Sequence, residues 1–255
     1  YRYECRLYSI KMELDEMMKQ HKPSALLKAL AKEQLMGKYG NAIAIFLVYI
    51  GMIYGCSGIA SIFSFLPGVI GTLLYYGVLL FCSIFSGFFA YGVNLAFLKT
   101  ACGTPAKVSD IFAGFKANSK EIMKAQAYKC LLTFLGMTPC YIFLEVVDLN
   151  KYPDLFGVYM LLIALGMVIE TLVTLVYNQV FFIMLDFPNY NAKKALAFSR
   201  ELMKGNKGRY LYFLLSFLPL IILGLMTCCV GLLWIMPYMQ TAMAFFYLDL
   251  MQNKN

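Results

Sequence analysis

The sequence predicts an all-α protein: a polytopic membrane helical bundle with six transmembrane helices and amphipathic interfacial helices on the cytoplasmic face. Apolar and aromatic residues make up 61% of the 255 residues and charged residues only 14%, against about 25% in an average soluble domain. Mean hydropathy is +0.67. The alternative is a soluble protein with a very apolar core, but the charges are too few and too clustered to coat its surface.

Six apolar runs are each long enough to cross the hydrocarbon core of a bilayer, which takes about 20 helical residues. We expect these spans at residues 41–65, 69–98, 125–147, 156–185, 210–227 and 231–250. In hydrocarbon each backbone N–H and C=O has to be paired within the segment, as it is in a helix. The runs lack the period-two alternation of a membrane β-barrel. The second and fourth runs exceed the bilayer, so their helices should tilt or project beyond it.

Lysine and arginine support this topology. If the N-terminus lies inside, 21 of the 22 cations fall on the inner side, and only Lys151 lies in an outer turn. Cytoplasmic loops of membrane proteins carry an excess of lysine and arginine. The pattern therefore predicts that both termini are cytoplasmic. We expect a cytoplasmic extension over residues 1–23 and a single membrane domain over residues 24–255.

The inner links contain three short amphipathic helices, at about residues 24–36, 108–118 and 192–204. In the third, Asn191 is a good N-cap and Gly205 a good residue to follow the C-terminus. Such helices lie in the membrane interface with their apolar faces toward lipid; the alternative is packing on a cytoplasmic domain. The cations in and after this helix form a candidate inner-face lipid or partner contact: Lys193, Lys194, Arg200, Lys204, Lys207 and Arg209.

A carboxylate stands in the middle of the fourth predicted span, at Glu170. A charge there costs about 2.5–3.5 kcal/mol on insertion scales. It predicts either a proton or cation site or a hydrogen-bonded glutamate that locks helices together. The candidate midplane polar site consists of Glu170, Asn178, Asn94 and Gln240. Three prolines interrupt other spans, a feature that transporters use at substrate sites and that is also common in ordinary bundles: Pro139, Pro219 and Pro237.

The sequence carries no enzyme signature. It has no HExxH, GxSxG or Walker motif, its one histidine is His21, and its eight cysteines include no CxxC pair. We therefore expect no catalytic residues, no cofactor and no metal. Two small-xxx-small pairs, Gly51 with Gly55 and Ser83 with Gly87, permit close helix approach. They favour packing inside the chain, with dimerisation as the alternative.

The C-terminal third contains the most specific motifs: Leu185 to Pro188, Ala195 to Ser199, Leu202 to Lys207, Leu215 to Phe217, Gly231 to Trp234, Pro237-Tyr238 and Phe246-Tyr247. With Leu27 to Gly40 and Asp110 to Phe115, they resemble the bacterial domain-of-unknown-function 975 family of integral membrane proteins over about residues 24 to 251. The resemblance implies fold and location, and it implies no activity.

Two positions depart from the family pattern. The Pro-Gly pair usual in the fourth span is replaced by Val168 to Thr171, so the fourth helix should be straighter. The Gly-Trp that usually follows Ser-Phe is replaced by Leu218-Pro219.

These observations favour a non-enzymatic, multi-pass protein of the bacterial cytoplasmic membrane that acts as a scaffold or partner-binding component. The alternative is a small transporter or permease component with a polar midplane site around Glu170. The expected partners are membrane lipids, with another membrane protein as a further candidate and no nucleic acid. The pattern assigns no oligomeric state.

Overall fold

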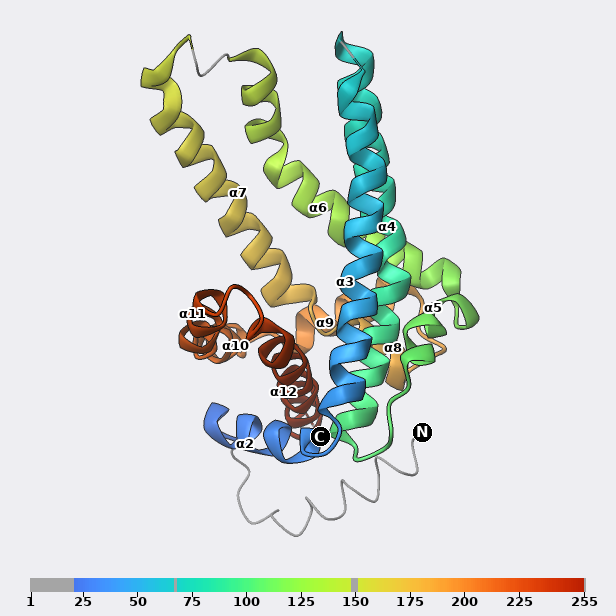
Figure 1. Ribbon diagram of the computed structural model, residues 1–255. Coiled ribbons are helices and arrows are strands. Elements are labelled where there is room, and N and C mark those ends of the chain that lie inside the picture. Colours follow the sequence, from blue (N-terminus) through green and yellow to red (C-terminus); the bar gives the residue numbers. More distant parts are fainter. Residues whose placement is uncertain (1–20, 67, 148–150, 255) are drawn as a thin grey trace.

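The computed structural model describes residues 21–66, 68–147 and 151–254, and all regular elements in these ranges are helical. Residues 1–20, which make up most of the predicted cytoplasmic extension, lie outside the described part of the chain. Two long helical hairpins rise from a base of shorter helices (Figure 1).

The first hairpin is formed by α3 (Tyr39–Ile62) and α4 (Gly68–Ala101), with the short helix η1 (Phe63–Phe65) near its tip. The second is formed by α6 (Ser119–Val146) and α7 (Phe156–Tyr177), with η3 (Pro153–Leu155) before α7. These helices match the first four predicted spans to within a few residues at most ends, because each apolar run is continuous. Helix α4 has 34 residues, so it is longer than the roughly 20 residues that cross the hydrocarbon core. The length of the second apolar run predicted this.

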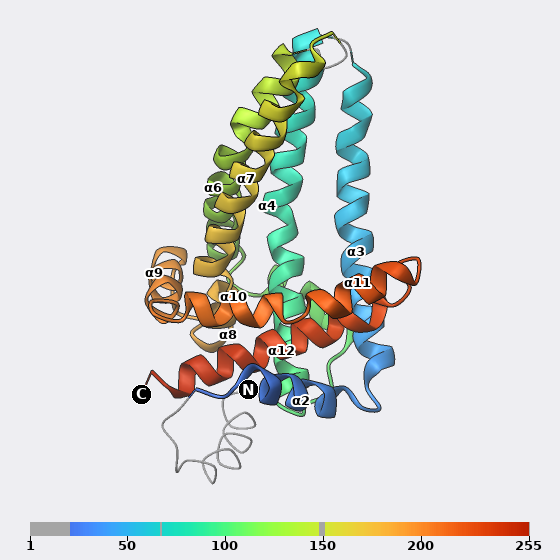
Figure 2. The ribbon, with the colours of Figure 1, turned by 90° about the vertical axis from the view of Figure 1, so that its left-hand side faces the viewer.

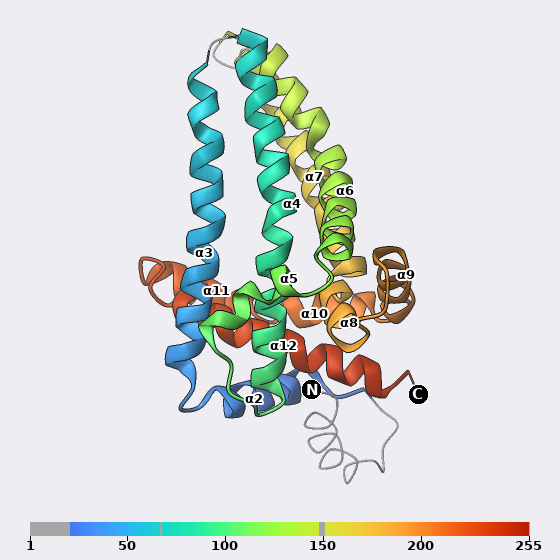
Figure 3. The same ribbon diagram turned by 90° about the vertical axis from the view of Figure 1, so that its right-hand side faces the viewer.

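The base contains the remaining elements: α2 (Ser24–Leu35), η2 (Val108–Phe112), α5 (Ala113–Lys116), α8 (Val180–Asp186), α9 (Ala192–Leu202), α10 (Lys207–Leu215), α11 (Leu218–Met226) and α12 (Leu232–Gln252). Figures 2 and 3 show α10, α11 and α12 running across the lower ends of the long helices rather than parallel to them. The chain returns from α11 to α12 at the level of the base, far from the tips of the hairpins.

Burial is concentrated in the base. The main buried cluster joins α8, α10 and α12 with the lower part of α4, and its largest fully buried side chains include Phe182, Tyr210, Phe213, Phe246 and Tyr247. The upper hairpins instead expose large apolar side chains, for example Ile62, Val69, Leu161 and Val168. Apolar surface of this extent requires a lipid or protein environment. The hairpins are therefore the part of the chain that a bilayer would cover.

Five helical segments of the described chain are long and apolar enough to cross a membrane, judged by length and composition alone. They are Tyr39–Ile62, Gly68–Ala101, Ser119–Val146, Pro153–Asp186 and Lys207–Met226. The helix of the sixth predicted span, α12, is not among them, so the count of six stays a prediction.

Two predicted spans are broken into shorter helices. The fourth is continuous across residues 168–171, as expected, but α7 ends at Tyr177 and α8 begins at Val180. Polar residues, Asn178 and Gln179, occupy this interruption. The fifth is divided between α10 and α11, with Pro219 in the first turn of α11; proline is favoured there because it lacks the N–H that a first turn leaves unpaired. Pro139 and Pro237 lie inside α6 and α12.

Two of the three amphipathic helices, α2 and α9, form about where they are expected, but they pack on the protein itself. The predicted helix at residues 108–118 is divided between η2 and α5, and its Phe112 and Phe115 are exposed. Asn191 Oδ1 caps α9 by accepting a hydrogen bond from Lys194 N at 2.9 Å, and Gly205 has φ +84° after its end. The apolar face of α9 is buried against the main cluster, and α2 packs on α12. These faces are covered by protein because the base supplies apolar surface that the sequence pattern does not reveal.

Only one of the two small-residue pairs mediates internal packing. Gly87 lies against Gln126 of α6, whose Nε2 donates to the Ser83 carbonyl at 3.2 Å. Gly51 and Gly55 are exposed, and nothing lies within 4 Å of a Cβ built at either position. For this pair the expectation of internal packing is wrong.

Candidate functional site

Glu170 lies on an exposed face of α7. Among the described residues it forms no ion pair or hydrogen bond, although it is close enough to Tyr141 of α6 to act on its hydroxyl electrostatically. A helix-locking hydrogen bond would require a partner for the carboxylate. The described part of the chain supplies none, so Glu170 does not tie α7 to another helix there.

Asn178 has a structural contact instead. It lies at the interruption between α7 and α8, where its Nδ2 donates to the Tyr210 hydroxyl and lies 3.7 Å from Met243 Sδ. This side chain therefore joins α7 to α10 and α12. The neighbouring Gln179 is completely buried, and neither of its side-chain polar atoms has a partner in the described structure.

The other two members of the candidate midplane site lie on separate helices. Asn94 donates from Nδ2 to the Ala90 carbonyl of its own helix α4 at 2.7 Å. Gln240 is half-buried in α12. Within the described ranges, no hydrogen bond or ion pair joins any two of the four residues. Asn94 is paired within its own helix and Asn178 with Tyr210 of α10, so no shared polar centre forms among the four.

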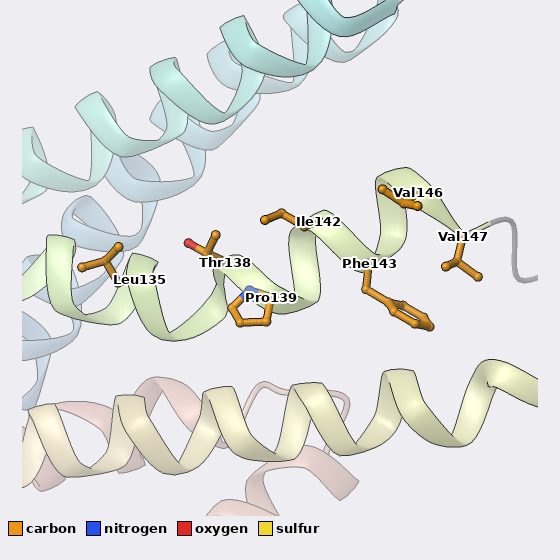
Figure 4. Close-up of a pocket in the computed structure, with 7 residues that line it drawn as sticks. All are labelled: Leu135, Thr138, Pro139, Ile142, Phe143, Val146 and Val147. Atoms are coloured by element: carbon orange, nitrogen blue, oxygen red, sulfur yellow. The ribbon is translucent and has the colours of Figure 1, made fainter.

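A groove of about 540 Å³ runs along the upper part of α6 (Figure 4). Thr138 is the one residue with a polar side chain among the residues that line it, which are Leu135, Thr138, Pro139, Ile142, Phe143, Val146 and Val147. Thr138 Oγ1 donates to the Phe134 carbonyl of its own helix at 2.8 Å. None of the four candidate polar residues lines this groove, and its lining resembles lipid-facing surface.

The candidate inner-face residues divide into two groups. Four lysines are exposed and free to meet a lipid or a partner: Lys193, Lys194, Lys204 and Lys207. The two arginines are held by protein contacts. Arg209 faces the interior of the base, whereas Arg200 is exposed and lies against two tyrosines.

Asp249 of α12 organises the contacts of Arg209. The Asp249 side chain is 1% exposed, and its Oδ2 lies 2.7 Å from Arg209 Nη2 and 3.2 Å from His21 Nδ1. Its Oδ1 accepts from the Lys22 backbone N–H at 3.0 Å. Arg209 also lies over the ring of Phe246, 4.7 Å from its centroid. This buried pair ties the residues that precede α2 to α10 and α12, and sequence reasoning did not identify it.

Helix α9 is fixed across the lower ends of α6 and α7 by three contacts. The Ala192 N–H donates to Glu121 Oε2 of α6 at 2.7 Å. Ser199 Oγ, which is completely buried, donates to the Val176 carbonyl of α7 at 2.7 Å. Arg200 Nη2 donates to the Tyr177 hydroxyl, and this hydrogen bond raises the pKa of the guanidinium. The exposed cations of α9 are therefore carried on a rigid element.

The described chain offers no group of three or more His, Cys, Asp or Glu side chains that could hold a metal ion. Its polar centres include the Asp249 pair, the Asn178 contact, the Arg200–tyrosine cluster and the ion pair between Lys99 and Asp110.

Comparison with known families gives one match, to a family described as protein of unknown function (DUF975), over residues 17–254. No curated protein and no solved structure matches the chain. The match extends over both hairpins and the whole base, which covers the motifs that carried the resemblance. The chain therefore belongs to the DUF975 family of proteins of unknown function.

Proposed function

We propose that this protein is a non-enzymatic scaffold or partner-binding component of the bacterial cytoplasmic membrane. The observation that carries the proposal is the dispersal of its polar residues: Glu170, Asn178, Asn94 and Gln240 share no hydrogen bond or ion pair in the described structure. A transporter that moves a proton or cation needs polar groups that converge on one site near the bilayer midplane. The packed base, by contrast, suits a protein that presents a fixed surface.

In this proposal α3, α4, α6 and α7 cross the bilayer and the base faces the cytoplasm. The cation pattern supports this orientation, because 21 of the 22 lysines and arginines fall on one side of the predicted topology. Helix α2 and the end of α12 lie at the same end of the hairpins (Figure 1), as an even number of crossings requires. The segment α10–α12 then lies along the inner interface, and six crossings are the alternative.

The proposed working surface is the inner-face platform formed by the exposed cations Lys193, Lys194, Arg200, Lys204 and Lys207. Cationic side chains at the cytoplasmic leaflet attract anionic headgroups, with about 1 kcal/mol for each lysine or arginine near the surface. The same charges suit an acidic surface on a membrane partner.

Reconstitution tests the scaffold role against transport. We expect proteoliposomes with the purified full chain to show no more proton or monovalent-cation flux than empty liposomes, measured with an internal pH dye and an applied ion gradient. A flux that Glu170→Gln abolishes and Asn94→Ala reduces would establish the transporter alternative.

Photo-crosslinking in intact membranes tests the platform. A photo-reactive amino acid replaces Lys193, and in a matched control it replaces Leu161 on the lipid-facing surface of α7. We expect one defined protein partner at position 193 alone, lost when Lys194 and Lys204 are both changed to Glu. The same products at both positions would contradict a partner-binding platform.

A further inference from the structure

Arg200 differs from most other paired cations of the base in the nature of its partners. Lys99, Lys124, Arg209 and Lys254 each form an ion pair with a carboxylate. Arg200 forms none with any described residue, and its neighbour Glu201 pairs with Lys254 at 3.4 Å. Its positive charge is therefore not neutralised by the described chain.

Two tyrosines hold the guanidinium in place without neutralising it. Arg200 Nη2 donates to the Tyr177 hydroxyl, and the guanidinium carbon lies 5.7 Å from the centroid of the Tyr177 ring. Tyr128 packs edge-on against Tyr177 with ring centroids 5.7 Å apart, and it lies close enough to Arg200 to act on the guanidinium electrostatically. Tyr177 is 5% exposed and Tyr128 39% exposed. A guanidinium has five N–H donors in a planar fork, so donors remain for a further acceptor.

Positive charge lies on both sides of this arginine. Lys193 and Arg200 are seven residues apart, which places them along one stripe of α9, and Lys204 follows in the turn after the helix ends at Leu202. Exposed Ala197 lies between Lys193 and Arg200 on that stripe, and its small side chain leaves the approach to the guanidinium open. Figures 2 and 3 both show α9 nearly end-on beside the lower parts of α6 and α7, so its axis runs across the hairpins. When the hairpins cross a bilayer, α9 lies along its plane.

We propose that Arg200, Tyr128 and Tyr177, flanked by Lys193 and Lys204, form a binding site for the phosphate of an anionic phospholipid headgroup. The inference rests on the bilayer crossing in the proposed function. It adds the class of lipid that this part of the platform would bind. Arginine matches phosphate because its fork donates two parallel hydrogen bonds. Tyrosine suits the membrane interface, where its ring meets acyl chains and its hydroxyl meets the headgroup. The two lysines favour a lipid with net negative charge over a zwitterionic one.

The test uses the purified full chain in a neutral detergent and follows its thermal unfolding midpoint. Short-chain phosphatidylglycerol, short-chain phosphatidylcholine and inorganic phosphate are titrated separately. A ligand that binds only the folded chain raises the midpoint with concentration. We expect phosphatidylglycerol to raise it, and phosphatidylcholine and inorganic phosphate to raise it far less.

Arg200→Gln should weaken the apparent affinity for phosphatidylglycerol about tenfold, as expected for the loss of a charge-assisted pair. Lys32→Gln is the matched control, because Lys32 is an exposed cation of α2 that lies outside the platform. Arg200→Lys and Tyr128→Phe preserve more of the local packing and should also weaken binding, so the test holds if the Gln variant does not fold.

Full phosphatidylglycerol affinity in both Arg200→Lys and Tyr128→Phe would overturn the site. An equal response to phosphatidylcholine would overturn its selectivity for anionic lipids, and an equal response to inorganic phosphate would assign it to a free anion. These results are independent of the flux and crosslinking experiments, so failure of the lipid site and failure of the scaffold role can be distinguished.

Discussion

At the scale of single residues, the described chain buries one carboxylate almost completely, and that carboxylate carries three contacts. Asp249 binds Arg209, His21 and the Lys22 backbone. Burying a charge is costly unless it is paired and hydrogen-bonded. The contacts of Asp249 satisfy that condition and fix the start of the described chain to the base.

Asp249→Ala should therefore destabilise the protein by about 3–5 kcal/mol, because it leaves Arg209 partly buried without its counter-ion. The measurement is denaturant unfolding of the purified chain in detergent. Glu201→Ala is the control: it breaks the more exposed pair with Lys254, and loss of such a pair costs about 0–1 kcal/mol. Equal losses in the two variants would mean that the buried pair does not stabilise the fold.

Sequence reasoning could not separate Asp249 from Glu170. Each is a lone carboxylate in an apolar helix, but Asp249 meets an arginine from α10, whereas Glu170 is exposed. Helical periodicity identifies residues that share a face but not the helix opposite that face. Arg209 was assigned to a lipid or partner contact for the same reason, since its position in a basic link gives no sign of the partner from α12.

At the scale of elements, close backbone contact fixes the inner link to the first hairpin. A Cβ built at Gly92 of α4 would lie 2.0 Å from the carbonyl oxygen of Ile111 in η2. That atom belongs to the backbone, so no side-chain rotation can relieve the clash. The completely buried Ile111 side chain packs in the cluster formed by α3 and α4.

Gly92→Ala should destabilise the protein by about 1–3 kcal/mol or more, the usual range for overpacking a well-packed core. Gly77→Ala on the same helix is the control, because Gly77 is exposed and nothing lies within 4 Å of its built Cβ. Alanine there should leave stability unchanged or raise it by up to about 1 kcal/mol. Thermal unfolding of both variants measures the difference, and a Gly92→Ala variant as stable as Gly77→Ala would contradict the close contact.

Most helices were predictable because their signals are local. Continuous apolar runs predicted α3, α4, α6 and α7, and Asn191 predicted the start of α9. Pro219 was expected to interrupt the fifth span, and the structure divides that span between α10 and α11 just before it. The interruption at Asn178 carries no proline or glycine and was missed. The packing of other helices against the apolar face of α9 was also missed, because those helices are distant in sequence.

At the scale of the whole molecule, hydropathy did not determine the direction in which the last helices run. Residues 210–248 contain no Asp, Glu, Lys or Arg, which suggested two further crossings. The structure instead lays α10–α12 across the base, where α12 supplies much of the main buried cluster (Figure 2). A helix buried in protein and a helix buried in lipid can have the same composition. Only the arrangement in space distinguishes them.

The return between α11 and α12 tests this arrangement, because it contains two exposed free cysteines, Cys228 and Cys229. With four crossings they lie on the inner side; with six they lie outside. In a variant whose other cysteines are replaced, we expect a membrane-impermeant maleimide to label these thiols in inside-out vesicles but not in intact cells. Asp154→Cys, in the turn before α7, should label from outside, and Lys193→Cys only from inside. Labelling of Cys228 from outside the cell would contradict the transverse placement of α10–α12, because the turn would then lie at the tips of the hairpins.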